Sequence, residues 1–509
     1  MAGSLRHVTA YLLLVVAIST LGPLQFGLHL AELNAPQHAI TCRKPSVSVA
    51  ARLSAWANSS RPDKNDKSPT PGLVPDCIPM NEAAYATISS LFTLGALAGA
   101  LVAGPLSSKR GRLSVMRYTA VLYAVGSLIE AVAASVWVMS LGRVISGLGA
   151  GASTVIVPLY ISEVSPPTER GLFGAMTQVS INVGILFTQT LGYFLSYGHA
   201  WRWILAAGLC VAVLQAVGLV CVPESPVWLA NNGDVAGGKR TMQRIRGTAS
   251  DIQAEVATWD SEGSVEQQRL LAEAAATEAP PPSSIASRTP THLGFAQVAK
   301  DPHYRPAIIA VVGIMFAQQI CGINSVIMYS VSLFSDMFPT SSTLLTIAIS
   351  AVNLVMTASC APLPDRLGRK ACLLLSIVGQ GTSALALAFS VVFGVKLLSV
   401  VAVLCFVGFF AVGLGPVPFV LASELVGQEA VGATQSWALA ANFTATFLVA
   451  QFFPIVNTAL NNALGGHGWA FFLFAALAAG SALFVTLKVP ETRGKKDMDD
   501  VWGRTRRVD

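Results

Sequence analysis

The sequence predicts an all-α membrane protein with twelve transmembrane helices, arranged as two six-helix halves. Of its 509 residues, 53% are hydrophobic and only 12% are charged, whereas soluble domains carry roughly 25% charged residues. Apolar segments of about 20 residues, the length that spans a bilayer, recur about twelve times. Short polar motifs also recur between the two halves. Together these observations predict a polytopic helical bundle with an internal repeat.

The amino-terminal half is expected to cover residues 1–222. Its first helix extends over about residues 8–33 and contains His29 and Glu32. We interpret this segment as a spanning helix, not as a signal peptide, because the apolar run continues without a small-residue cleavage site. Five more helices follow, and Arg143 lies early in the fourth.

The polar loop of residues 35–80 is expected on the non-cytosolic side. It is rich in proline and carries a glycosylation sequon at Asn58. Cys42 and Cys77 share this loop, so we consider a disulfide there, as is common outside the cytosol. The loop is also basic, which departs from the positive-inside rule, although long loops obey that rule poorly.

Hydropathy falls between the halves, over residues 223–302. This segment is acidic in part and rich in proline and serine, so we predict a cytosolic linker with short helices. The carboxy-terminal half follows at residues 303–488, and residues 489–509 form a polar tail. Basic residues in the short turns predict that both termini are cytosolic.

Three polar motifs recur in the same order in the two halves. Each lies where an apolar segment ends; the pairs are Gly111-Arg112 with Gly368-Arg369, Ser162-Glu163 with Ser423-Glu424, and Pro223-Glu224 with Pro490-Glu491. Three matches in register predict a parallel repeat, which is typical of proteins whose halves rock about a site near the bilayer midplane.

Charged residues in and near these motifs are candidates for a gating network. We expect them to pair at cytosolic helix ends, to favour an outward-open arrangement, and to separate when the protein opens inward. The alternative is that they are solvated turn charges. The candidates are Arg112, Arg143, Glu163, Arg170, Glu224, Asp365, Arg369, Glu424 and Glu491.

A group of amides interrupts the first apolar segment of the second half. Gln318, Gln319 and Asn324 lie at a depth where polar groups are costly and usually face a cavity or a partner. Gly322 between them permits a break in the helix. Neutral amides donate and accept hydrogen bonds, which suits a ligand covered in hydroxyls. The alternative is that they bond helices together.

A second break is predicted where Pro416 and Pro418 follow Gly415. Each proline removes a backbone donor from a membrane helix. Freed carbonyls are tolerated only where protein or a water-filled cavity satisfies them. We therefore expect Phe419, which follows directly, to line a cavity.

With these motifs in hand, the chain resembles the sugar porter family of the major facilitator superfamily and is similar to the facilitative glucose transporters. Further matching pieces are Leu24-Gln25-Phe26-Gly27, Asn34-Ala35-Pro36-Gln37, Gly142-Arg143, Glu163-Val164-Ser165-Pro166, Pro223-Glu224-Ser225-Pro226 and Asp365-Arg366-Leu367-Gly368-Arg369-Lys370. The resemblance implies the major facilitator fold and transport of a monosaccharide by alternating access. It implies a sugar site built from Gln178, Gln318, Gln319, Asn324, Asn353 and Asn442, with Phe419 as a wall.

The chain departs from the family pattern at several of these positions. Phe419 replaces a family tryptophan, Ala411 a glutamate, and Thr446 a second asparagine. The carboxy-terminal half therefore offers fewer polar contacts, which leaves the identity of the sugar or polyol open.

The first helix bears on proton coupling. Proton-coupled relatives have an aspartate opposite the arginine that matches Arg143, whereas this chain has His29 there and Glu32 three residues later. We expect facilitated diffusion, with a proton-coupled sugar or polyol symporter, using His29 or Glu32, as the alternative. A non-transporting sugar sensor is a further alternative, but the tail is short for one.

Other functional classes find little support in the sequence. We expect no enzyme activity, no catalytic or metal-ligating residues and no cofactor, because no metal-spaced cluster or phosphate-binding loop is present in the sequence. The expected partners are a small-molecule sugar, the lipid bilayer and, in the alternative, protons, but not nucleic acid. Residence in the plasma membrane or the vacuolar membrane stays open.

Overall fold

The computed structural model describes residues 8–42, 75–247, 252–253, 255–256, 295–334, 342–427, 430–495 and 498–503. Within these ranges every regular element is helical. The helices of the amino-terminal half and the linker are α1 (Ala10–Ser19), α2 (Leu21–Ala31), α3 (Gln37–Ile40), α5 (Glu82–Arg110), α6 (Arg112–Ala131), α7 (Val136–Val164), η2 (Pro167–Glu169), α8 (Arg170–Leu195), η3 (Gly198–Ala200), α9 (Trp201–Gly218), α10 (Pro226–Asn231), α11 (Val235–Arg246) and α13 (Phe295–Lys300).

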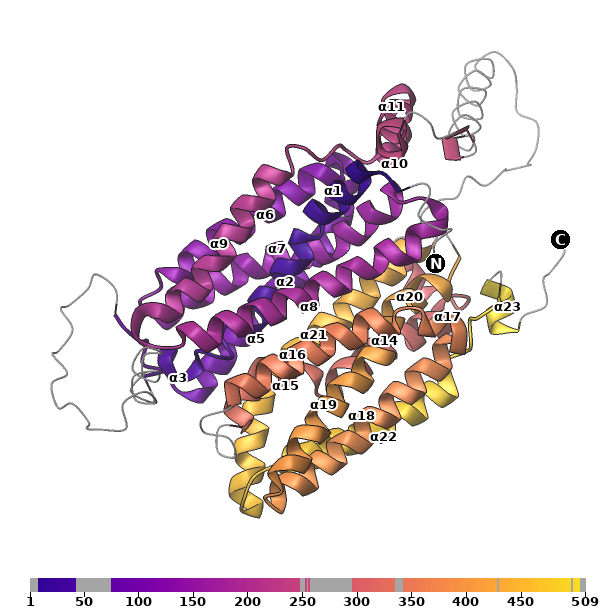
Figure 1. Ribbon diagram of the computed structural model, residues 1–509. Helices are drawn as coiled ribbons and strands as arrows, with labels where there is room; N and C mark the ends of the chain where they lie inside the picture. The colour runs from indigo at the N-terminus through magenta and orange to yellow at the C-terminus, as the bar shows by residue number, and fades with distance from the viewer. Residues whose placement is uncertain are drawn as a thin grey trace, which may run out of the picture.

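The carboxy-terminal half continues the series with shorter, interrupted helices. They are α14 (Arg305–Ile320), α15 (Ile323–Phe334), α16 (Ser342–Cys360), α17 (Leu363–Leu367), α18 (Arg369–Val392), α19 (Lys396–Val412), α20 (Val417–Glu424), α21 (Val431–Leu464), α22 (Trp469–Lys488) and α23 (Met498–Trp502). Figure 1 shows the two halves as two layers, the first from indigo to magenta and the second from orange to yellow.

The bundle has the length and hydropathy of a twelve-helix membrane protein. Eleven segments of the described chain are long and apolar enough to cross a bilayer, counting α1 with α2, α14 with α15, and α19 with α20 as one segment each. The twelfth is α6, a 20-residue helix that packs against α7 and α9. Its Arg117 and Glu130 lower its hydropathy.

Helices pack in the same pairs in both halves. In the first, α6 contacts α7 and α9, and α2 contacts α8; in the second, α18 contacts α19 and α22, and α14 contacts α21. The halves meet where α5 packs on α21 and α8 packs on α16. In chain order α5 corresponds to α16 and α8 to α21, so the two contacts between the halves are equivalent. A parallel two-fold repeat produces this arrangement, as the recurring motifs predicted.

Small residues allow the closest contacts within the amino-terminal half. A Cβ atom on Gly151 of α7 would collide with the Ala96 carbonyl of α5, and one on Gly99 would collide with the Leu148 carbonyl of α7. Close backbone approach through small residues is how membrane helices pack without a hydrophobic driving force between them.

The two ends of the bundle differ in what they carry. The end with α10, α11, α17 and α23 is called the clamp end, and the end with α3 is called the disulfide end (Figure 1). The first and last described helices, α1 and α23, both lie toward the clamp end.

Candidate functional site

The motif that joins α5 to α6 builds a cluster at the clamp end, the amino clamp (Arg112, Glu163 and Glu224). The Arg112 guanidinium donates from Nε and Nη2 to the Glu163 carboxylate, with N–O distances of 2.8–3.2 Å. Glu224 accepts the backbone N–H groups of Arg112 at 2.8 Å and Leu113 at 3.1 Å. Gly111 has φ +91°, and a Cβ there would collide with the Glu224 carboxylate. The glycine is therefore required by its backbone conformation, and a Cβ there would also push the Glu224 carboxylate away from the N–H groups that it accepts.

The same geometry recurs in the second half as the carboxy clamp (Arg369, Glu424 and Glu491). Arg369 donates from Nε and Nη2 to Glu424 at 2.8–3.2 Å. Glu491 accepts the N–H groups of Arg369 at 2.9 Å and Lys370 at 3.1 Å. Gly368, with φ +101°, makes the same close approach to Glu491. Paired donation from one guanidinium to one carboxylate fixes geometry as well as charge.

The carboxy clamp has more contacts than the amino clamp. The Thr492 hydroxyl donates to Glu424 at 2.5 Å, and Asp365 lies 3.0 Å from the Arg369 guanidinium. Burial acts to raise the pKa of Glu491, but four backbone N–H groups outweigh it and hold that pKa below its usual value. Glu491 therefore remains a carboxylate, and its hydrogen bonds join the start of α18 to the segment that follows α22.

The predicted gating network is wrong about Arg170. It lies exposed at the start of α8, after the short helix η2, and its side chain forms no ion pair within the described ranges. The Glu163 carboxylate is instead used by Arg112. Each clamp also joins helices of its own half, so neither clamp is a direct bond between the halves.

Arg143, which the sequence also assigned to the gating network, lies inside the bundle. It belongs to a buried ion cluster formed by His29, Glu32, Glu130 and Arg143, whose side chains are at most 1% exposed. Arg143 Nη1 donates to Glu32 Oε1 at 2.5 Å and to the His29 carbonyl at 2.8 Å. His29 Nδ1 lies 2.9 Å from the same carboxylate oxygen. Glu32 thus pairs with Arg143 of α7.

Glu130 is the member of the buried ion cluster that sequence reasoning missed. Its Oε1 accepts from the Ser146 hydroxyl at 2.7 Å, and its Oε2 lies 3.8 Å from Arg143 Nη1 and 4.0 Å from His29 Nδ1. A carboxylate in an apolar helix is by itself a signal of function, and that signal could have found Glu130.

The buried ion cluster can carry more negative than positive charge. With both carboxylates ionised and the imidazole neutral, two negative charges face one guanidinium. Carboxylate oxygens Oε2 of Glu32 and Glu130 have no hydrogen-bond partner in the described part of the chain. An uncompensated buried charge is costly, so the cluster is suited to take up one proton.

The buried ion cluster also places three possible metal-ligating residues together, one histidine and two glutamates, contrary to the expectation of no such cluster. One atom each of His29, Glu32 and Glu130 lies within 4.8 Å of the others. However, the Arg143 guanidinium already supplies the positive charge that Glu32 contacts. We therefore interpret the group as an ion-pair cluster and not as a metal centre.

The second half buries a neutral counterpart, the amide network of Gln318, Gln319, Asn324 and Asn442. Asn442 Nδ2 donates to Gln318 Oε1 at 2.5 Å, and Gln319 Nε2 donates to the same oxygen at 3.2 Å. Asn324 Nδ2 donates to Gln319 Oε1 at 2.6 Å. Gly322, with φ +96°, interrupts the helix between α14 and α15, as the sequence predicted. The break brings amides from both short helices together.

Gln318 has a further contact that sequence reasoning did not foresee. Its Nε2 donates to the carbonyls of Leu414 at 2.5 Å and Gly415 at 3.2 Å. These carbonyls lie in the predicted break, between the end of α19 at Val412 and the start of α20 at Val417. Gln318 therefore satisfies backbone that the break would otherwise leave unpaired.

The remaining predicted site residues lie outside the amide network. Asn353 of α16 donates to Asn182 Oδ1 of α8 at 3.3 Å, and Asn182 donates to Thr357 at 2.8 Å. These bonds cross between the halves. Gln178 lies one turn before Asn182, is half-buried, and makes no side-chain hydrogen bond among the residues described. Phe419 is also half-buried and packs against a cluster that includes Ala96 of the first half.

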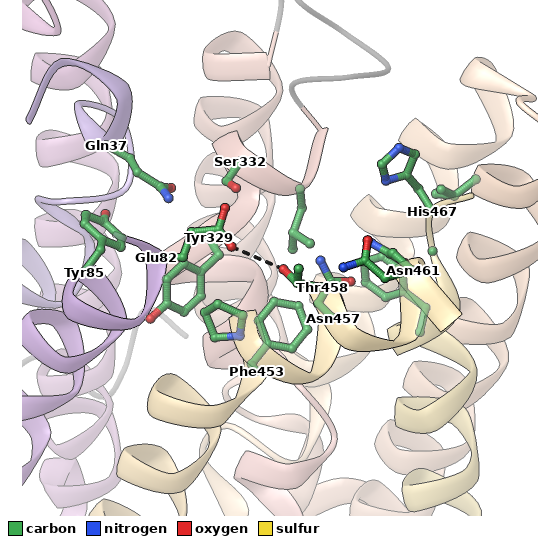
Figure 2. A pocket seen from close by; sticks show the side chains of 16 residues that line it. Gln37, Glu82, Tyr85, Tyr329, Ser332, Phe453, Asn457, Thr458, Asn461 and His467 are labelled. Carbon is green, nitrogen blue, oxygen red and sulfur yellow. Dashed lines mark hydrogen bonds between the residues drawn. The ribbon is translucent and has the colours of Figure 1, made fainter. Parts of the chain in front are cut away.

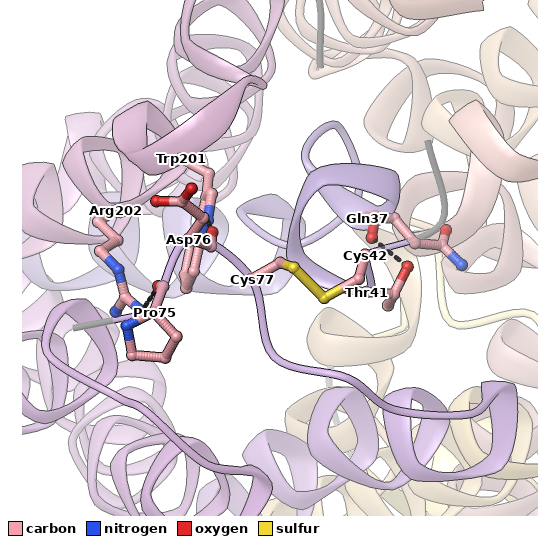
Figure 3. Close-up of a disulfide and its surroundings, with 8 residues drawn as sticks. All are labelled: Gln37, Thr41, Cys42, Pro75, Asp76, Cys77, Trp201 and Arg202. Carbon is pink, nitrogen blue, oxygen red and sulfur yellow. Dashed lines mark hydrogen bonds between the residues drawn. A yellow bond between two sulfur atoms is a disulfide. The ribbon is translucent and has the colours of Figure 1, made fainter. Parts of the chain in front are cut away.

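At the disulfide end, Cys42 and Cys77 form a disulfide with their Cα atoms 5.4 Å apart (Figure 3). The segment before Cys77 is tied to the start of α9, because Trp201 Nε1 donates to the Asp76 carbonyl at 2.8 Å. The predicted glycosylation position, Asn58, lies outside the described residues.

The two halves are tied together toward the disulfide end. Asn34 Nδ2 donates to the Ile327 carbonyl and to the Ser330 hydroxyl, both at 2.9 Å. Ser90 of α5 donates to Gln451 of α21 at 2.7 Å. The clamps and these ties therefore occupy opposite ends of the same bundle.

Comparison with known proteins places this geometry in a family. The family model described as sugar (and other) transporter matches residues 14–500. The chain is 33% identical over 501 residues to the probable metabolite transport protein YBR241C of Saccharomyces cerevisiae, covering 97% of this chain and 96% of that protein. It is 31% identical over 503 residues to the human solute carrier family 2, facilitated glucose transporter member 4, covering 96% and 90%.

Among solved structures, the fold is similar to the xylose transporter XylE from E. coli in a partially occluded inward open conformation. The TM-score is 0.69 at 21% identity, and the match covers 96% of this chain and 100% of that one. The helical architecture, the full-length family match and the relatives agree, and the chain belongs to the sugar (and other) transporter family.

Proposed function

We propose that the protein moves a hexose or similar monosaccharide across a membrane by alternating access, as facilitated diffusion. The observation that carries this proposal is the amide network, which buries neutral donors and acceptors at a break between two membrane helices. A sugar presents hydroxyl groups that need both kinds of partner and need no charge. The family, and a relative named a facilitated glucose transporter, support the same substrate class.

The proposed sugar site centres on Gln319, Asn324 and Asn442. Gln318 also belongs to the proposed site, and its hydrogen bond to the Leu414 carbonyl stabilises the break between α19 and α20. Gln178 and Asn353, on α8 and α16, would contact the sugar from helices that meet between the halves. Phe419 would form an apolar wall. The amide–amide bonds of the network are the ones that a bound sugar would exchange for its own hydroxyls.

The proposed movement is a rocking of residues 1–222 against residues 303–488, joined by the linker of residues 223–302. Each clamp would hold the helix ends of its half as one rigid unit. The ties between Asn34 and α15 would break when the disulfide end opens. We place both termini in the cytosol, which puts the clamp end inside, and we assign the protein no enzymatic activity.

Proton-coupled symport is the second candidate, and the buried ion cluster favours it. Two carboxylates and one imidazole share a single guanidinium in a fully buried site. Protonation would relieve the excess negative charge and change how tightly Arg143 holds α2 to α7. Coupling would then follow if proton uptake and sugar binding favour the same conformation.

Uptake of radiolabelled D-glucose and D-xylose into proteoliposomes tests both candidates. Accumulation only to equal concentrations, with no dependence on an imposed pH gradient, is the result expected for facilitated diffusion. Accumulation above the external concentration, driven by the gradient and lost in Glu130→Gln, identifies the symporter. Absence of uptake for both D-glucose and D-xylose would contradict the proposed function.

A further inference from the structure

A polar pocket, of about 250 Å³, lies between the halves at the disulfide end. Figure 2 shows Gln37 and Glu82 on the side of the first half, with Asn457 and Asn461 of α21 across from them. None of the residues of the amide network lines it. The cavity is therefore separate from the site proposed above.

Amide groups in this cavity have unused hydrogen-bonding capacity. Gln37 is only 7% exposed, yet its Oε1 has no partner within the described part of the protein. Asn461 Oδ1 is also buried without a partner there. Asn457, one turn earlier on the same face of α21, makes no side-chain hydrogen bond among described residues. Both oxygens are shielded from water, so a ligand would reach Gln37 and Asn461 through their NH2 groups, together with the amide of Asn457. Amide NH2 groups donate, which suits a ligand whose hydroxyl oxygens accept.

Aromatic rings form the floor of the cavity. The Tyr329 ring lies 6.3 Å from that of Tyr85 and 6.0 Å from that of Phe453, measured between centroids. The Tyr329 hydroxyl donates to the Ala450 carbonyl at 2.7 Å, so that hydroxyl is already used. Tyr329 is only 3% exposed and Phe453 7%, so the floor offers a ligand a small apolar contact and not a broad ring face.

This floor separates the cavity from the amide network along two helices. On α15, Asn324 belongs to the network and Tyr329 to the floor. On α21, Thr446 accepts from Asn324, Phe453 belongs to the floor, and Asn461 lies roughly 22 Å beyond Thr446 at about 1.5 Å per residue. A single monosaccharide cannot contact both places at once.

We propose that this cavity is a second saccharide-binding pocket, which holds a neutral monosaccharide at the disulfide end before or after it occupies the amide network. The amides of Gln37, Asn457 and Asn461 would bond its hydroxyls, and its apolar face would rest on Tyr329 and Phe453. At about 30 Å³ per water, the cavity has room for roughly eight waters, which suits one sugar ring and not a longer chain. The sugar as ligand rests on the proposed function.

Charge at the pocket makes it selective for neutral ligands. Glu82 Oε2 accepts from the Thr458 hydroxyl at 3.2 Å, which fixes a carboxylate on the wall beside the amides (Figure 2). A sugar acid would place a second negative charge near this group, and like charges repel. D-glucuronate should therefore compete for the pocket less well than D-glucose.

Equilibrium binding of radiolabelled D-glucose to the purified full-length protein tests the proposal. The parent should bind two sugars per chain. Asn461→Leu and, independently, Gln37→Leu should weaken one site about tenfold or more, since each removes an amide from the pocket. The double variant Gln319→Ala/Asn324→Ala should lose the other site. Asn232→Leu makes the same chemical change as Asn461→Leu at the clamp end and should leave both sites intact.

The outcomes separate this inference from the proposed function. The second pocket is overturned if the parent binds one sugar per chain, or if both sites are unchanged in both pocket variants. In either case normal uptake would still support the proposed transport function. Absence of both uptake and binding overturns the proposed function as well. Asn457→Leu, with a thermal unfolding midpoint like the parent's, is the replacement should either pocket variant fail to fold.

Discussion

The two halves share one device at the clamp end and differ in what they bury further in. Both clamps use a glycine turn, an arginine and two glutamates in the same arrangement. Inside, however, the first half buries the ion cluster around Arg143, whereas the second half buries the amide network around Gln318. The shared part is a mechanical fastening, and the part that differs is where chemistry can be assigned.

This difference suggests a division of labour between the halves. Carboxylates and an imidazole can hold or release a proton, but burying their charge is costly and a neutral sugar does not neutralise it. Amides can hydrogen-bond to hydroxyls without the cost of removing a charge from water. The second half is therefore suited to sugar recognition, and the first half to setting which conformation is favoured.

The largest expected effect comes from breaking the buried ion cluster. Arg143→Gln leaves the Glu32 and Glu130 carboxylates without their guanidinium, which should cost about 3–5 kcal/mol of stability. Thermal unfolding of the purified protein measures this. Adding Glu32→Gln should restore part of the loss, because the two residues are coupled.

The matched control for this variant is Arg110→Gln. Arg110 is exposed and, among the described residues, donates only to the Tyr118 hydroxyl, so its loss should change stability by about 0.5 kcal/mol or less. If Arg143→Gln unfolds no earlier than Arg110→Gln, the buried charges are not coupled as described, and the contrast between the halves fails.

Two residues of the amide network are expected to differ in role: Gln318 stabilises the fold as well as binding sugar, whereas Asn324 mainly binds sugar. Gln318→Leu removes the donor from the Leu414 and Gly415 carbonyls, so we expect a loss of about 1–3 kcal/mol in stability together with weaker sugar binding. Asn324→Ala breaks bonds to side chains only and should weaken sugar binding with a smaller loss of stability. Unfolding midpoints and sugar affinities of the two variants would be compared; equal loss of stability would contradict this assignment.

The clamps allow a direct test between equivalent positions. Glu163→Gln and Glu424→Gln each weaken a paired arginine contact, and Glu424 also accepts from the Thr492 hydroxyl. Each clamp fixes helix ends within its own half, so loosening it should make the packed arrangement of the two clamp ends less favourable. We therefore expect both variants to shift the population toward the conformation open at the clamp end, by about 1 kcal/mol or roughly fivefold, with the larger shift for Glu424→Gln. Cysteine accessibility at the two ends measures the shift.

Arg170→Gln is the control for the clamp variants. Arg170 is exposed and stands outside the amino clamp, so its loss should leave accessibility unchanged. A shift as large as that of Glu163→Gln would restore Arg170 to the network and show that the described pairing is incomplete.

Much of the fold followed from patterns that are local in sequence. The length of the apolar segments predicted the spans, and the recurrence of Gly111-Arg112 as Gly368-Arg369 predicted the repeat. Each arginine follows its glycine directly, so one short motif specifies both the turn and the donor. The break at Gly322 was also predictable, because only glycine readily adopts φ +96°.

The contacts that were missed depend on how distant segments pack. Glu130 meets His29 and Arg143 only because α2, α6 and α7 pack together. Arg170 was placed in the amino clamp from its nearness in sequence to Glu163, but the start of α8 leaves it exposed. The second pocket combines residues of α3, α5, α15 and α21, and no spacing in the sequence indicates such a meeting.

The smallest expected effect concerns Phe419, where the second half departs from the tryptophan of the family it resembles. Phe419 lies in the first turn of α20, directly after the break that Gln318 supports. It is half-buried against a cluster that includes Ala96 and Phe443, so its ring lies where the two halves meet. An aromatic residue at that junction can form the apolar wall of a sugar site, but phenylalanine provides no donor.

Phe419→Trp adds an indole N–H at this position. If the ring lines the sugar path, the variant should bind glucose-like sugars more tightly by up to about 1 kcal/mol, the net contribution of one hydrogen bond. Phe419→Ala should weaken the same sugars by loss of apolar contact. Uptake kinetics over a panel of hexoses, pentoses and polyols measures both. Unchanged kinetics in both variants would place Phe419 in the packing between the halves and leave sugar recognition in the second half to the amides alone.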